Sequence, residues 1–323
     1  MARTNFGNLS RLTSKAESRL KTKRLASSAM GVQKIYYPIM IGRINLDTYL
    51  YFKTSQYRLR DYKLNTLSKF LLNDDKIDMP IMEMNRLWKM RDDAGMARVC
   101  DYCFKDVILP LSLLEVEDAM IGYVESSRIT RTPLSVLVVS GQRVKVLNQV
   151  YFYAEHRNMF VNSFDIPKTK YQGATVLPPK FGYHEQWIDV CDFASLYPSI
   201  IQQYNLCPST LILDWKENHR IYKRLKNYKE YKMPNGKIHR FVKKSTLEGI
   251  IPDMERHLLA YRKRTKKEMK KAKKNSREYK RLNAKQMAIK VSCNSIYGFF
   301  GVRQGALKCQ PVAEVTTFIG RQV

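Results

Sequence analysis

The spacing of apolar residues predicts most of the elements. Trp187 to Phe193 are mainly bulky residues that favour extended backbone, which is typical of a strand in a half-buried sheet. Pro198 fits the first turn of a helix directly after it, and Ile200, Ile201 and Tyr204 give that helix an apolar stripe. This strand–turn–helix predicts an acidic side chain, Asp192, at the strand tip, beside the free N–H groups of the helix start.

The N-terminal part is predicted to be mixed. Residues 1–34 are basic and weakly patterned, which favours a solvated arm. Residues 34–53 contain strand-like apolar runs interrupted at Gly42. An extended segment then leads into a helix carrying Leu64, Leu67, Phe70 and Leu71. A longer helical pattern covers 80–114.

The C-terminal part is predicted to be largely helical. Residues 129–154 alternate Arg and Lys with Val and Leu, which is compatible with a helix along a domain seam. Residues 233–242 contain an Asn-Gly turn signal and predict a β-hairpin. Residues 245–298 predict two long antiparallel helices, with Asn275 and Glu278 as the capping signal of the second.

Composition narrows the class of protein. The chain has 323 residues, 44% apolar and 27% charged, which indicates a globular protein of two or three domains. Its 57 basic and 29 acidic residues give a net charge of +28, which favours a polyanionic partner. Charge alone does not separate nucleic acid from an anionic membrane surface, but no apolar run reaches the ~18 residues of a membrane span. We see no secretory signal and no internal repeat.

The six cysteines predict reduced packing residues of an intracellular protein. Six cysteines spread over a chain this large do not suggest a disulfide framework. Cys100 and Cys103 form a C-x-x-C, but no second pair lies nearby to complete a tetrahedral zinc site.

Two further spacings suggest chemistry. Tyr102 and Asp106 lie four residues apart on a predicted helix, where a phenol can orient water while the carboxylate holds a metal ion. Tyr and Asp at this spacing are also common on helix surfaces. At the other end of the chain, a hard divalent cation can sit on Asp192 and phosphate oxygens on the adjacent amides. The alternative for Asp192 is an ordinary surface carboxylate.

The predicted helical hairpin carries cations on defined faces. Arg262 and Lys266 share one face of its first helix, and Lys290, Asn294 and Tyr297 share one face of its second. The three cations can converge on a triphosphate. A solvated basic face is the alternative, although the apolar neighbours of Lys290 weaken it.

These residues occur in motifs that resemble those of the family B DNA polymerases. D-F-A-S-L-Y-P-S-I (192–200) resembles the family's motif A, and K-V-S-C-N-S-I-Y-G (290–298) resembles its motif B. Y-C-F-K-D-V-I-L-P-L-S-L-L-E (102–115) resembles its third exonuclease motif. Y-Q-G-A-T-V (171–176) resembles the Y-x-G-G-type element, with Ala at the second Gly; an ordinary turn is the alternative. The residues of motif A, followed by N-L-C (205–207), resemble most those of polymerase delta-like and herpesvirus-like members. We expect a large DNA virus as the source.

The resemblance implies a role for each matching residue. Asp192 would be catalytic and would hold the metal with the Phe193 carbonyl. The incoming nucleotide would contact Ser195, Leu196, Tyr197, Arg262, Lys266, Lys290, Asn294 and Tyr297. Tyr197 would exclude a ribose 2′-OH. Tyr171, Gly173 and Gly298 would contact DNA, and Tyr102 and Asp106 would be exonuclease residues.

The implied fold class is α/β (α+β, multidomain), with part of a ribonuclease H-like exonuclease domain followed by a palm and a long helical fingers hairpin. The implied domains are exonuclease 1–125, connector 126–186, palm 187–245, fingers 246–300 and a return to the palm at 301–323. We expect an internal piece of the family's sequence, because the upstream D-x-E motif and the downstream Y-G-D-T-D-S hairpin are not found. Without that second aspartate, the piece alone should not polymerise DNA.

The implied activity is template-directed synthesis with two Mg²⁺ ions as cofactor. The implied partners are primer–template DNA, dNTP and a processivity factor, with no membrane, and the implied location is the nucleus. Two alternatives stay open: a non-catalytic basic nucleic-acid-binding protein, and a reverse transcriptase or RNA polymerase. Tyr197 and the order of the motifs argue against the second alternative.

Overall fold

Helices form most of the described structure. The computed structural model describes residues 19–27, 31–55, 57–161, 171–301 and 306–323. Within these residues the strands form two separate two-stranded antiparallel sheets. The chain divides into two compact units, residues 1–124 with 133–139 and residues 125–132 with 140–323, and each is described by itself.

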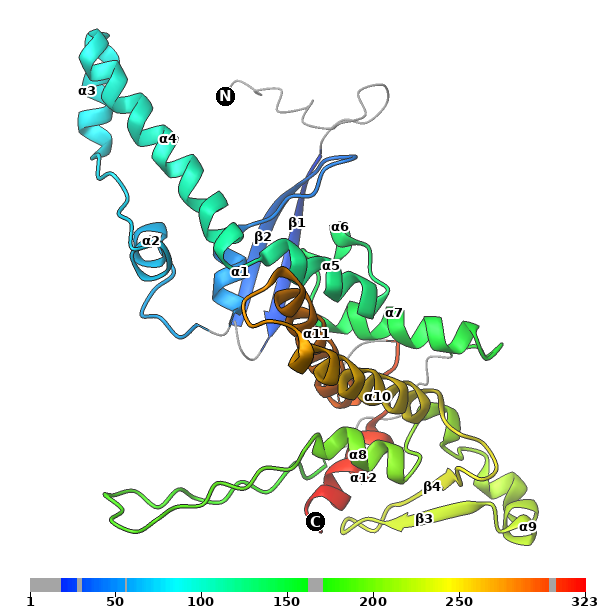
Figure 1. Cartoon of the computed structure of the whole chain (residues 1–323). Coiled ribbons are helices and arrows are strands. Elements are labelled where there is room, and N and C mark those ends of the chain that lie inside the picture. The colour runs from blue at the N-terminus through cyan, green and yellow to red at the C-terminus, as the bar shows by residue number, and fades with distance from the viewer. Residues whose placement is uncertain (1–18, 28–30, 56, 162–170, 302–305) are drawn as a thin grey trace. The chain divides into compact units, whose positions relative to one another are not determined.

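The first unit contains a β-hairpin and four helices that end before residue 117 (Figure 1). Its elements before residue 117 are β1 (Arg19–Ser27), β2 (Gly31–Ile39), α1 (Thr48–Thr54), α2 (Leu64–Leu72), α3 (Ile81–Met90) and α4 (Asp93–Val116). The beginning of α5 and the short helix α6, whose bounds are given below, also belong to this unit. Phe52 of α1, Leu67 of α2 and Leu113 of α4 form a buried cluster. Burying each of these side chains stabilises the fold by about 1.5–3 kcal/mol.

Three predictions for the first unit were wrong in part. Residues 19–34 belong mostly to paired strands and not to a solvated arm, and the prediction for 1–18 lies outside the described residues. The strand-like run expected after Gly42 ends in helix α1, which the Asp47 side chain caps by accepting from the Leu50 amide (3.2 Å). The helix expected at 80–114 is broken at Arg91, whose φ of 53° is left-handed.

The segment predicted as one helix at 129–154 is three pieces: α5 (Ala119–Thr130), α6 (Leu134–Leu137) and α7 (Gln142–Glu155). Pro133 and Gly141 stand directly before α6 and α7, so the breaks fall at a proline and a glycine.

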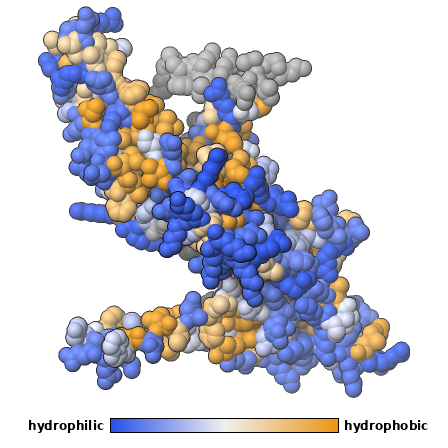
Figure 2. Space-filling model, viewed as in Figure 1, coloured by the Kyte–Doolittle hydropathy of each residue, from blue (hydrophilic) through white to orange (hydrophobic). Residues whose placement is uncertain are grey.

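The second unit contains the expected helical hairpin. Its other elements are α8 (Leu196–Gln203), the 3₁₀ turn Pro208–Thr210, α9 (Trp215–Leu225), β3 (Tyr228–Lys232), β4 (Ile238–Val242) and α12 (Gln310–Gly320). The hairpin consists of α10 (Ile250–Lys271) and α11 (Arg277–Phe300), which pack on each other and both contact α7 and α8. In Figure 2 the surface over this hairpin is hydrophilic, while its inner face joins the core through Met254, Ile289 and Ile296.

The predicted capping signal of α11 is shifted by one residue. Ser276, and not Asn275, is the N-cap, and its hydroxyl accepts from the Tyr279 amide (3.1 Å). Asn275 has φ 63° and makes the turn between the two helices.

Two buried polar residues fix the loops around α8 and the β3–β4 hairpin. The Asn205 amide nitrogen donates to the carbonyls of Val242 (2.9 Å) and Leu247 (2.8 Å), and its oxygen accepts from the Gly249 amide (2.9 Å). The Glu314 carboxylate of α12 accepts from Asn235 (2.8 Å) and lies 3.0 Å from His239 Nε2. These bonds tie β4 and the hairpin turn to the rest of the unit.

The strand predicted at 187–193 is not formed. Residues 171–193 have irregular backbone in a long excursion that ends at α8 (Figure 1), and Trp187, Ile188 and Val190 are exposed. A strand that is bulky on both faces is stable only when it is paired within a covered sheet, and no described strand lies beside it. The expected palm sheet is therefore missing from the described part of the fold.

Candidate functional site

The start of α8 brings motif A into a turn. Ser195 has φ 61° and ψ 52°, and its carbonyl accepts from the Ser199 amide (2.9 Å). No side chain caps the first turn, so the amides of Leu196 and Tyr197 lack a side-chain acceptor. Pro198 lies in the first turn as predicted, and Ile200 and Ile201 are buried. The turn therefore leaves backbone donors for an anion.

Three tyrosines from distant parts of the sequence meet at the first turn of α8. The rings of Tyr197 and Tyr297 lie 4.4 Å apart, centroid to centroid. Burial, and then a hydrogen bond with Tyr171, raise the pKa of Tyr297. A Cβ on Gly301 would lie 2.8 Å from the Tyr171 hydroxyl, so the absence of a side chain there lets that phenol approach. The structure thus joins motif A, motif B and the Y-x-G element.

The Y-x-G element is held by the end of α12. The Arg321 guanidinium donates to the carbonyls of Gln172 (2.8 Å) and Gly173 (2.6 Å), and Thr317 donates to Gln172 (3.2 Å). Sequence reasoning missed Arg321, because nothing local marks a cation whose partners lie so far away in the chain.

The predicted face of α11 is present. Lys290, Asn294 and Gly298 are exposed, and Tyr297 is half-buried beside them. They project from one side of the helix, as their spacing requires. Lys290 is therefore solvated and is not enclosed by its apolar sequence neighbours.

Of the two α10 cations expected to bind a triphosphate, one is exposed and the other is turned toward α11. Lys266 is exposed. Arg262 turns toward α11, donates weakly to Gln286 Oε1 (3.5 Å), and has a buried Nε without a partner among the described residues. No hydrogen bond or ion pair of the described chain joins Asp192 to Arg262 or Lys290. The structure brings the tyrosines together and leaves Asp192 apart, exposed on irregular backbone.

The donor atoms fit Mg²⁺ in kind and fall short in number. Asp192 offers a carboxylate and Phe193 a carbonyl, and hard oxygen ligands are what Mg²⁺ prefers. Among the described residues, no group of three or more His, Cys, Asp or Glu could hold a metal ion. Water and phosphate oxygens would have to complete the shell.

Tyr102 and Asp106 lie on one face of α4 as predicted, with Lys76 between them. The Lys76 ammonium donates to the Tyr102 hydroxyl (3.3 Å) and lies 3.4 Å from the Asp106 carboxylate. The hydrogen bond from Lys76 to Tyr102, together with Asp106, raises the pKa of Lys76. A cation bound at Asp106 would compete with this ammonium.

Curated relatives resemble nearly the whole chain. The DNA polymerase delta catalytic subunit of Drosophila melanogaster is 36% identical over 98% of this chain, and that of Candida albicans is 34% identical over 98%. The chain spans 29% and 30% of these two proteins, under a third of their length. These relatives are cellular, so they do not support the expected viral source.

A solved structure shares the fold. The family B DNA polymerase from the hyperthermophilic archaeon Pyrobaculum calidifontis matches with a TM-score of 0.64, over 93% of this chain and 37% of that chain, at 24% sequence identity. In the described part of the chain, no helix has the length and apolarity to span a membrane.

The sequence profile described as DNA polymerase family B matches residues 132–323, which include motif A, motif B and the three tyrosines. The profile match does not include Tyr102 and Asp106, so it gives no support to the exonuclease assignment. The chain belongs to DNA polymerase family B.

Proposed function

We propose that this chain is the part of a replicative DNA polymerase that binds the incoming dNTP and the primer end during template-directed DNA synthesis. The observation that carries the proposal is the contact of Tyr197 with Tyr297, which joins motif A to the exposed face of α11. Relatives named DNA polymerase delta catalytic subunit support it over nearly the whole chain.

The proposed roles of motif A follow from its donors and its turn. Asp192 and the Phe193 carbonyl hold metal, and the amides at the start of α8, with Ser195 and Leu196, face phosphate oxygens. Two Mg²⁺ ions, when bound, stabilise the attacking and leaving oxygens of phosphoryl transfer. Tyr197 lies beside the sugar and excludes a 2′-hydroxyl.

The proposed roles of the hairpin follow from exposure and charge. Lys290 and Lys266 bind the triphosphate, and Arg262 joins them after turning away from Gln286. Asn294 and Tyr297 position the nucleotide. Tyr171, Gly173 and Gly298 contact the DNA, where the absence of side chains on the glycines lets a phosphate backbone approach.

The proposed polymerase domains follow the order of the motifs along the chain. Residues 187–245 and 301–323 form palm, 246–300 form fingers, 126–186 connect, and 1–125 belong to an exonuclease domain with Tyr102 and Asp106. A processivity factor and a nuclear location belong to the same proposal.

A chimera tests the function. This chain is joined to the downstream part of a polymerase delta catalytic subunit that carries the Y-G-D-T-D-S hairpin, and Mg²⁺-dependent primer extension is measured. Asp192→Ala should lower the rate roughly a hundredfold or more, because a fixed charge at the reacting phosphate is lost. Asp189→Ala, in the same exposed segment, is the matched control and should keep the rate.

The net charge of +28 favours a second candidate, a basic nucleic-acid-binding protein without chemistry. DNA binding with no extension by the chimera would support that candidate. Full activity of Asp192→Ala would remove Asp192 from the site.

A further inference from the structure

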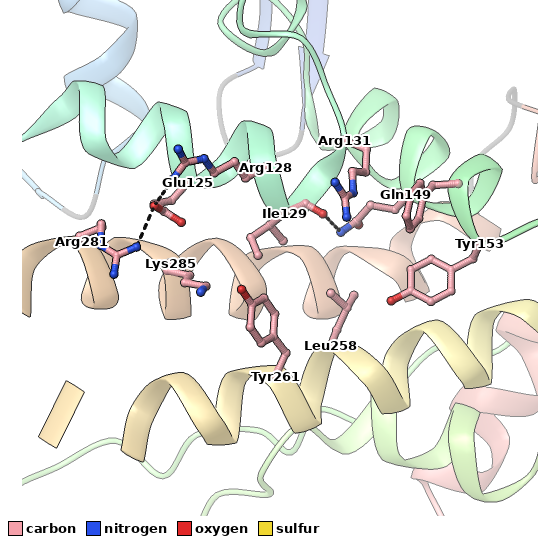
Figure 3. Close-up of a pocket in the computed structure, with 11 residues that line it drawn as sticks. Glu125, Arg128, Ile129, Arg131, Gln149, Tyr153, Leu258, Tyr261, Arg281 and Lys285 are labelled. Carbon is pink, nitrogen blue, oxygen red and sulfur yellow. Dashed lines mark hydrogen bonds and ion pairs between the residues drawn. The ribbon is translucent and has the colours of Figure 1, made fainter. Parts of the chain in front are cut away.

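A pocket of about 410 Å³ lies between α7, α10, α11 and the end of α5, within the second unit (Figure 3). Its volume falls in the usual range for small-molecule sites. None of the proposed polymerase residues lines it. Its lining combines one carboxylate, four cations, one buried amide and several aromatic and apolar side chains.

Gln149 fixes the frame of the pocket. This α7 side chain is buried, and its nitrogen donates to the Ile129 carbonyl (2.8 Å). Its oxygen accepts a short hydrogen bond from the Ser292 hydroxyl of α11. The Gln149 amide therefore connects α7 both to the end of α5 and to α11. Because these three elements are held together, the pocket between them is preformed.

The pocket carries more positive than negative charge. Its lining contains four cations, Arg128, Arg131, Arg281 and Lys285, and a single carboxylate, Glu125, which is 3% exposed. Arg128 donates to Glu125 at 3.1 Å and Arg281 lies 3.9 Å from it, as the dashed lines in Figure 3 show. One carboxylate cannot neutralise four cations, so the pocket retains capacity for an anion.

Aromatic rings form the walls between these cations. The Arg131 guanidinium lies 4.4 Å from the centre of the Phe152 ring, and the Lys285 ammonium lies 4.4 Å from the centre of the Tyr261 ring. In Figure 3, Tyr261 rises from α10 toward Lys285. Alternating rings and cations suit a ligand that has both a flat π face and a phosphate.

The pocket lies apart from the motif B face of α11. At about 100° per residue, Arg281 and Lys285 project roughly opposite to Lys290, Asn294 and Tyr297. A ligand in the pocket would therefore contact the other side of the hairpin from the proposed dNTP.

We propose that this pocket is a second nucleotide-binding site, in which a base stacks on Tyr261 or Phe152 and its phosphate is bound by Arg281, Lys285 and Arg128. The nucleotide can come from a single-stranded nucleic acid or from the free pool. The site does not depend on Asp192 or on synthesis.

Binding to this chain is measured with a short fluorescein-labelled oligothymidylate by anisotropy, and the contact is mapped with a bromodeoxyuridine-containing strand by photocrosslinking. Arg281→Gln with Lys285→Gln should weaken binding roughly tenfold and lower the salt slope by about 0.7 per lost phosphate contact. Tyr261→Leu should weaken binding by about tenfold and remove the crosslink to α10.

The matched control is Lys270→Gln with Arg277→Gln, two exposed cations of α10 and α11 outside the pocket. It removes the same charge and should change the affinity by about twofold or less. Thermal unfolding of every variant confirms that it is folded.

The competitors distinguish the sources and the alternatives. Competition by free thymidine monophosphate supports a mononucleotide site, whereas competition only by unlabelled strand supports a nucleic-acid site. An acidic peptide that competes as well as the strand would overturn the proposal, because then charge alone is recognised. Equal losses in the pocket and control variants, or crosslinks confined to the Lys290 face, would also overturn it.

Discussion

Glu255 is a carboxyl group buried on α10, with the Cys293 thiol of α11 beside it. Its exposed fraction is 0%, and this weakly polar thiol is the hydrogen-bonding neighbour of its carboxyl group. Burial raises its pKa to about 8, and burial followed by the neighbouring Glu255 raises the pKa of the Cys293 thiol. The folded chain therefore prefers Glu255 protonated.

This preference predicts how stability depends on pH. Because the folded pKa is raised, the stabilising effect of the bound proton is complete below the unfolded pKa of about 4.3 and is lost as the pH rises through about 8. Glu255→Gln should raise the free energy of unfolding by a few kcal/mol above about pH 8, and should flatten its decline from pH 5. Denaturant unfolding at several pH values measures this.

Glu268→Gln, exposed on the same helix, is the control and should leave the decline unchanged. An unchanged slope in Glu255→Gln would show that the carboxyl group is hydrated in solution.

Tyr197 allows a prediction about how the proposed polymerase selects deoxyribonucleotides over ribonucleotides. In the chimera, Tyr197→Ala should raise ribonucleotide incorporation roughly tenfold or more, because the ring that would meet the 2′-hydroxyl is gone. Tyr197→Phe keeps the ring against Tyr297 and should retain the selection. Primer extension with rNTP and dNTP in parallel measures the ratio, and unchanged rejection by the Ala variant would contradict the steric role.

At the scale of elements, the N-cap of α11 tests how the α10–α11 hairpin is stabilised. Ser276→Ala should lower the free energy of unfolding by about 1 kcal/mol, because the Tyr279 amide loses its acceptor. Asn275→Gly keeps the left-handed turn and should change stability by much less. If Asn275→Gly lowers the free energy of unfolding more than Ser276→Ala does, Asn275 and not Ser276 is the residue that caps α11.

The elements that local spacing determines were predictable, and those that need distant partners were not. The hairpin α10–α11 and the first turn of α8 follow from apolar stripes and from Pro198. Trp187–Phe193 has strand composition, but pairing depends on a neighbour that the segment itself does not specify. Tyr102 and Asp106 share a face of α4 as their spacing requires. Their partner Lys76 lies between α2 and α3, and the spacing on α4 gives no sign of it.

The candidate site divides in the same way. Motif spacing predicted that Lys290, Asn294 and Tyr297 share a face, and it could not predict that Tyr171 reaches Tyr297 or that Arg321 holds Gly173. The pocket beside α7 could not be predicted, because Arg281 and Lys285 look like solvated charges in the sequence. Gln149, a polar residue between the apolar Val146 and Val150, was the available signal.

At the scale of the whole molecule, the charge of +28 predicts strong dependence of DNA binding on salt. If six or more phosphates are contacted, affinity for DNA should fall roughly 10³-fold between 50 and 200 mM salt. Anisotropy titrations over that range measure the slope. A slope near zero would show that the excess charge faces something other than nucleic acid.

The buried Gln149 amide has a mechanical consequence. Its oxygen binds Ser292 of α11 and its nitrogen binds the Ile129 carbonyl at the end of α5. If α11 moves relative to α7, either one of these buried hydrogen bonds breaks, or residues 128–131 move together with α11. Breaking a bond would leave a buried polar group without a hydrogen-bond partner. Joint movement of α11 and residues 128–131 therefore costs less free energy. Movement of the α10–α11 hairpin would then change the shape of the pocket beside α7, and a ligand bound there would oppose that movement.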